Sequence, residues 1–165
     1  MEISDKMKDA LNEQVNAELY SAYLYLSIAA YAEAKNFKGF AHWLKLQAQE
    51  ELEHAMKIYN FIYERSGKVV LKEIKQPPIE WSSFKDMFKN VYEHEKHVTE
   101  LIHNLVKLAR EERDTATEVF LHWFVNGQVE EEDSARTIYE KLKLAEEKIN
   151  ILFMIDRELG SRKKD

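Results

Sequence analysis

The feature that most constrains this fold is the spacing of apolar residues over four long stretches of the chain. Between about residue 5 and residue 142, apolar side chains recur in alternating steps of three and four, except at two short turns and one longer break. This spacing places them along one face of an α-helix that packs against other helices. With only 4 Gly and 2 Pro in 165 residues, the sequence predicts an all-α bundle of four long helices.

Capping residues mark where these helices begin. Ser4, Ser82 or Ser83, and Asp114 directly precede the first, third and fourth helical patterns, and side chains of these types accept hydrogen bonds from free backbone N–H groups. The second helix follows a short turn, and Gly67 is expected to end it in a left-handed conformation. A shorter fifth helix is expected over about residues 146–159.

Residues 68–81 interrupt the helical pattern. The first half of this segment alternates like an extended strand, and Pro77 and Pro78 exclude a helix. Fourteen extended residues can reach roughly 46 Å, and the preceding helix is roughly 42 Å long. The connection can therefore cross the full height of the bundle, which predicts a single domain over residues 1–165 with up-down-down-up helices and one crossover.

Polar residues replace apolar ones near the middle of all four helical faces. In any one helix these could be solvated surface residues, but their agreement in position on four helices favours an internal layer. In a bundle of helices of similar length, the midpoints share one level whichever way each helix runs. The residues at these positions are Glu18 and Tyr25, then Glu51 and His54, then Glu95, and finally Gln128 and Glu131.

Such a layer requires cations. A buried, uncompensated carboxylate costs several kcal/mol, so four of them cannot all stay ionised without positive charge nearby. Oxygen ligands with one imidazole suit a divalent ion such as Fe(II) and suit copper(I) poorly. The residues suffice for two ions, one held by Glu18, Glu51 and His54 and the other by Glu95, Gln128 and Glu131, with Glu51 as a bridge.

Composition excludes several classes of function. The net charge of −6 argues against a nucleic-acid partner. The absence of cysteine excludes disulfides and Cys-ligated metal sites. No apolar stretch is long enough to span a bilayer, and the N-terminus shows no signal-peptide pattern. We therefore expect a cytoplasmic protein with neither a membrane nor a nucleic-acid partner.

Four segments, residues 14–25, 49–54, 92–96 and 120–132, resemble those of prokaryotic non-haem ferritins. The resemblance extends over essentially the whole chain. It implies a ferritin-like fold and a homo-oligomeric cage of 24 subunits that oxidises Fe(II) with O2 or H2O2 and stores ferric mineral. It also implies that Tyr25 is a hydrogen-bonding or redox residue beside the iron pair, although the side chain could equally be a packed core tyrosine.

Two positions separate this chain from related families. Bacterioferritins carry a haem-ligating Met where this chain has Leu52, so no haem is expected. Similar ferritins usually have a Glu before the Gln of the fourth helix, where it helps to form a third iron site with Glu50, Glu130 and Glu131. Here that residue is Gly127, which removes a ligand and is itself unfavourable inside a helix. The unbroken apolar register on both sides nevertheless predicts that the helix continues.

Two other functions fit parts of the pattern. A di-iron carboxylate oxidase acting on an organic substrate would share the fold and the metal site, but it would need an apolar pocket beside the metals. A non-enzymatic helical scaffold protein would need no metal, and its helical faces should be apolar throughout. The polar layer disfavours the scaffold.

Overall fold

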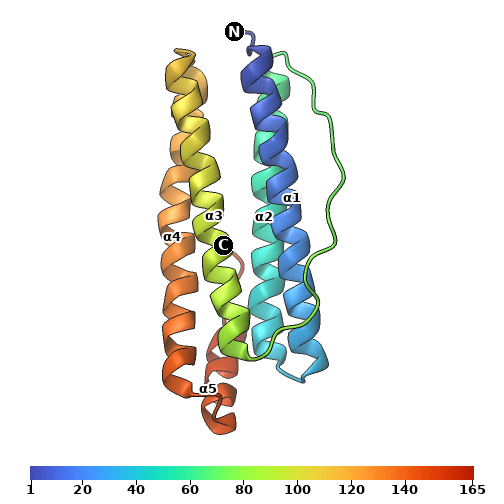
Figure 1. Ribbon diagram of the computed structural model, residues 1–165, viewed down its shortest axis with the longest axis vertical. Helices are drawn as coiled ribbons and strands as arrows, with labels where there is room; N and C mark the ends of the chain where they lie inside the picture. Colours follow the sequence, from blue (N-terminus) through green and yellow to red (C-terminus); the bar gives the residue numbers. More distant parts are fainter.

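The computed structural model describes residues 1–165 as five helices without a strand (Figure 1). The long helices run antiparallel in the pairs α1 with α2 and α3 with α4, and the connection between α2 and α3 follows the outside of the bundle from one end to the other. This confirms the all-α, up-down-down-up arrangement with one crossover. The helices are α1 (Asp5–Ala34), α2 (Lys38–Glu64), α3 (Phe84–Glu111), α4 (Thr115–Ala145) and α5 (Ile149–Gly160).

The helix starts follow the predicted caps. The side chain of Ser4 accepts a hydrogen bond from the backbone N–H of Met7, and Asp114 does the same for Thr117. Ser83 caps α3. Each cap satisfies one of the backbone donors that a helix leaves free in its first turn.

Two local expectations were wrong. Ser66, not Gly67, takes the left-handed conformation after α2, with φ of 60°. Gly67 is instead required by close packing, because a Cβ there would lie 2.9 Å from the side chain of Ile62. The fifth helix begins at Ile149 rather than near 146, since Glu146 and Glu147 both have positive φ. The segment between α2 and α3 forms neither helix nor strand, as expected of the crossover connection.

The hydrophobic core is divided into two parts. One cluster of 22 buried residues lies toward α5 and contains Phe40, while another of 12 lies toward the other end and contains Leu11. Glu18, Glu51 and Glu95 are buried between them, each no more than 2% exposed. The expected polar layer is therefore present at the middle of the bundle.

The short helix α5 packs against the start of α2. A Cβ on Gly39 would lie 1.7 Å from the backbone oxygen of Asp156, so only glycine permits this approach. The Asp156 carboxylate accepts a hydrogen bond of 2.9 Å from the backbone N–H of Phe40, which caps α2 from outside. The chain after α5 then returns toward the middle of the bundle (Figure 1). None of the five helices combines the length and hydropathy that a membrane span requires.

Candidate metal centre

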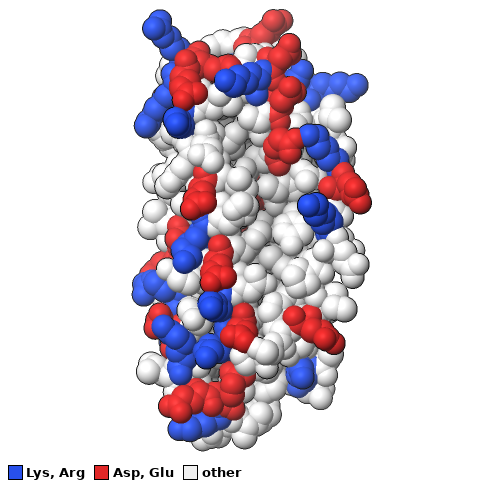
Figure 2. Space-filling view, viewed as in Figure 1, with Lys and Arg blue, Asp and Glu red and all other residues white.

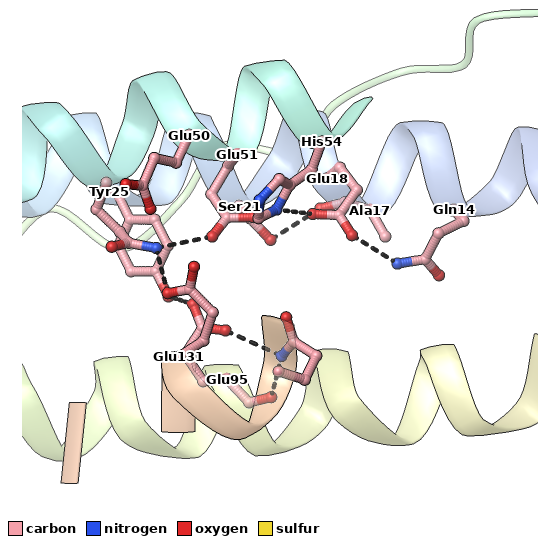
Figure 3. A network of polar contacts seen from close by, with 12 residues as sticks. Gln14, Ala17, Glu18, Ser21, Tyr25, Glu50, Glu51, His54, Glu95 and Glu131 are labelled. Carbon is pink, nitrogen blue, oxygen red and sulfur yellow. Dashed lines mark hydrogen bonds and ion pairs between the residues drawn. The ribbon is translucent and has the colours of Figure 1, made fainter. Parts of the chain in front are cut away.

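Glu18 on α1 and Glu51 with His54 on α2 form the first group of possible ligands (Figure 3). Nδ1 of His54 lies 3.2 Å from Oε2 of Glu51 and 3.9 Å from Oε2 of Glu18. One ligand atom from each residue lies within 4.8 Å of the others. Because Glu51 and His54 are three positions apart, one turn of helix presents both to the same point.

Glu51 also belongs to a second group, with Glu95 on α3 and Glu131 on α4. The ligand atoms of this group again lie within 4.8 Å of one another. The two groups therefore adjoin, and Glu51 stands between them as a bridging carboxylate would. Each of the four long helices contributes at least one carboxylate.

Neutral amides, not cations, support these acids. Gln14 donates a hydrogen bond of 3.0 Å to Glu18, and Gln47 donates to both Glu51 (2.9 Å) and Glu131 (2.7 Å). No lysine or arginine nitrogen lies within 4.0 Å of the four carboxylates. The centre therefore lacks the positive charge that four buried carboxylates require.

One ligand atom is left without a partner. Oε2 of Glu18 is buried and accepts no hydrogen bond. A buried acceptor without a partner loses the hydrogen bonds that water would provide, at a cost of about 1–3 kcal/mol. This oxygen is the one that faces His54 and Glu51. The donor set thus fits a divalent cation that would satisfy this atom.

Burial and mutual repulsion raise the carboxyl pKa values. Burial, followed by repulsion from Glu51, raises the pKa of Glu18 well above 4.5, and the Glu51 pKa is raised in the same way by burial and Glu95. The Glu95 pKa rises to about 7, mainly through burial, and that of Glu131 rises to about 8 through burial and repulsion from Glu95. Without metal these groups bind protons more tightly than free carboxyl groups do, and a binding cation would displace those protons.

Tyr25 and Gln128 both hold Glu95. The hydroxyl of Tyr25 donates to Oε1 of Glu95, and Nε2 of Gln128 donates to Oε2 at 3.1 Å. Burial and the nearby Glu95 charge raise the Tyr25 pKa well above 10, which keeps the hydroxyl protonated as a donor. Gln128 therefore supports a ligand here, and its expected role as a ligand itself stays a prediction.

Glu50 and Glu130 lie outside both groups. Oε1 of Glu50 pairs with Arg162 at 3.0 Å, and Glu130 is exposed. Both line a polar pocket that reaches His54 and Glu131 from the surface. Helix α4 continues through Gly127 as predicted, and a Cβ there would meet nothing within 4 Å. The expected part of Glu50 and Glu130 in a third iron site stays a prediction.

The two supporting amides, Gln14 and Gln47, were not among the predicted site residues. Gln14 lies four positions before Glu18, and Gln47 lies four before Glu51, a spacing that brings side chains together on a helix. That spacing could have identified both as partners of the buried acids. No comparable pattern points to Arg162, which follows the last helix.

A four-helix bundle that buries a layer of carboxylates from all four long helices is typical of the ferritin-like fold. Residues 8–145 match the family described as a ferritin-like domain. The chain belongs to the ferritin family.

Relatives cover nearly the whole chain. A bacterial non-heme ferritin of Bacteroides fragilis is 44% identical over 160 residues, which are 97% of this chain and 99% of that protein. One from Staphylococcus epidermidis is 39% identical, covering 97% of this chain and 96% of that protein. A solved open-pore ferritin from the archaeon Archaeoglobus fulgidus shares 52% identity at a TM-score of 0.96, with 98% of this chain and 99% of that one covered.

Proposed function

We propose that the protein is an iron-storage ferritin that oxidises Fe(II) at the centre of each subunit, with O2 or H2O2 as the oxidant. The observation that carries this proposal is the pair of adjoining ligand groups sharing Glu51, in a buried layer that has no lysine or arginine at ion-pair distance. Two Fe(II) ions held side by side can each give one electron to a common oxidant. The oxygen-rich ligands favour the ferric product that results.

The protein's own residues order this reaction. Glu51 lies where one carboxylate can contact both ions, and Tyr25 keeps its proton and fixes Glu95. His54 and Glu131 face the polar pocket, which they line together with Glu50, Glu53 and Glu130. This acidic pocket would attract Fe(II) and provides a route between the centre and the surface.

The di-iron oxidase alternative is less well supported. An organic substrate would need an apolar pocket next to the ligands. The pocket that reaches His54 and Glu131 is lined by acids and has one hydrophobic residue, Trp123. The scaffold alternative is disfavoured by the two-part core, because a purely structural bundle gains nothing from a layer of buried acids.

We further propose that 24 copies form a cage around the stored mineral. Figure 2 shows charged side chains of both signs along the α3 side, whereas the middle of the face over α1 is largely uncharged. An apolar groove between α1 and α2 includes the exposed side chains of Tyr23, Leu26 and Leu52. The outer face of α5 exposes Phe153 and Met154. Exposed apolar surface of this kind is typical of subunit interfaces.

Two measurements test these proposals together. Size-exclusion chromatography with light scattering should give about 470 kDa for a cage of 24 chains of 19.6 kDa each. Absorbance after Fe(II) addition should show rapid oxidation, which Glu51→Ala and His54→Ala should abolish without changing the assembly. A small monomer or dimer would contradict the cage, and unchanged initial rates in both variants would contradict the assigned centre.

A further inference from the structure

Arg162, in the tail after α5, lies against one side of α2. Its Nη1 donates to the backbone oxygen of Trp43 and to Oε1 of Gln47, both at 3.1 Å. Its Nη2 lies 3.0 Å from Oε1 of Glu50, and the guanidinium carbon lies 4.5 Å from the centre of the Trp43 ring. The side chain is only 19% exposed. An arginine with this many fixed contacts has a defined orientation.

The contact with Gln47 determines which way that amide points. A guanidinium group only donates hydrogen bonds, so the Gln47 atom that faces it must be the amide oxygen. The amide nitrogen then faces the centre, where it donates to Glu51 at 2.9 Å and to Glu131 at 2.7 Å. A flipped amide would place a donor against the guanidinium and an acceptor against two carboxylates.

We propose that Arg162 is a positioning residue for the metal centre, acting through Gln47. This role rests on the proposed function of the centre as an Fe(II) site. By fixing the amide of Gln47, Arg162 holds carboxylates from α2 and α4 in one relative position. Arg162 also pairs with Glu50, an acid that lines the pocket leading to His54 and Glu131.

The position of Arg162 depends in turn on α5. Arg162 follows the last residue of that helix by two positions, and the close approach of Gly39 to Asp156 fixes α5 against α2. Nε2 of His42 also donates to the backbone oxygen of Arg162 at 2.7 Å. The fifth helix therefore places the positive charge of Arg162 against Gln47, whose amide in turn donates to the carboxylates of Glu51 and Glu131.

The test uses Co(II) as a spectroscopic probe of the metal-free, assembled protein. Arg162→Gln removes the guanidinium, and Arg157→Gln is the matched control, because Arg157 is exposed on α5 and lies outside both ligand groups. We expect Arg162→Gln to weaken Co(II) binding roughly tenfold or more and to change the visible Co(II) spectrum. Arg157→Gln should leave both unchanged, and Arg162→Lys should be intermediate because an ammonium cannot make the same forked contacts.

A double-mutant cycle separates positioning through Gln47 from a general effect of charge. Gln47→Leu should weaken Co(II) binding by itself, and adding Arg162→Gln should then have little further effect. Fully additive losses, or unchanged Co(II) affinity and spectrum in Arg162→Gln, would overturn the proposal. Circular dichroism and light scattering establish that each variant is folded and assembled. Wild-type protein that binds Co(II) but fails to oxidise Fe(II) would contradict the proposed function alone.

Discussion

The hydroxyl of Tyr25 on α1 donates a hydrogen bond to Glu95 on α3 across the buried middle of the bundle. Both residues are at most 2% exposed. The contact fixes one oxygen of a carboxylate whose other oxygen accepts from Gln128. It joins the two helical pairs at the level where the proposed metal ligands meet.

Tyr25→Phe should therefore slow Fe(II) oxidation without preventing metal binding. Losing one hydrogen bond to a charged group costs roughly 1.5 kcal/mol, and a loss of this size in the transition state corresponds to about a tenfold lower rate. Stopped-flow absorbance at saturating Fe(II) measures the effect. Tyr20→Phe is the control on the same helix, since the Tyr20 ring packs near His94 and not against the carboxylates. Equal rates in wild type and Tyr25→Phe would show that the contact has no catalytic role.

The helices and the polar layer were predictable because both rest on local spacing. The three-and-four period identifies the face of each helix that is buried. Acids on these faces, such as Glu18 and Glu95, must therefore meet inside any bundle of these helices. Individual turn conformations and side-chain contacts could not be predicted in this way. The positive φ of Ser66 and the guanidinium contacts of Arg162 depend on tertiary packing, which one-dimensional periodicity does not encode. Which residues actually bind iron is still a prediction.

Glu18→Gln should stabilise the metal-free protein while weakening its metal site. The substitution removes a buried acid whose Oε2 has no hydrogen-bond partner, so we expect a gain of about 1–2 kcal/mol in the free energy of unfolding near pH 8. The number of Co(II) ions bound per subunit should fall from two to one. Thermal unfolding and Co(II) titration measure the two effects. A lower melting temperature for the metal-free variant would contradict this account of Glu18.

The stability of the metal-free protein should fall as pH rises. The native pKa values of Glu95 and Glu131 are raised to about 7 and about 8, from 4.5. Between pH 4.5, the ordinary carboxyl pKa, and these raised native pKa values, the native state binds more protons than the unfolded state. Raising the pH through this window therefore favours unfolding. The melting temperature should therefore drop by several degrees between about pH 5 and pH 8. Saturating Co(II) should oppose this trend, because the metal binds the deprotonated carboxylates. A metal-free melting temperature that rises over this range would contradict the raised pKa values.

Two glycine substitutions should have opposite effects on stability. Gly39→Ala places a Cβ 1.7 Å from the backbone oxygen of Asp156, so α5 must shift, and we expect a loss of about 1–3 kcal/mol. Gly127→Ala places its Cβ where nothing lies within 4 Å, in the interior of α4. It should stabilise the protein by up to about 1 kcal/mol through helix propensity alone. Denaturant unfolding of the metal-free variants compares the two directly. A neutral Gly39→Ala would mean that α5 is not fixed by this contact, and Arg162 would then lack the rigid support that its position requires.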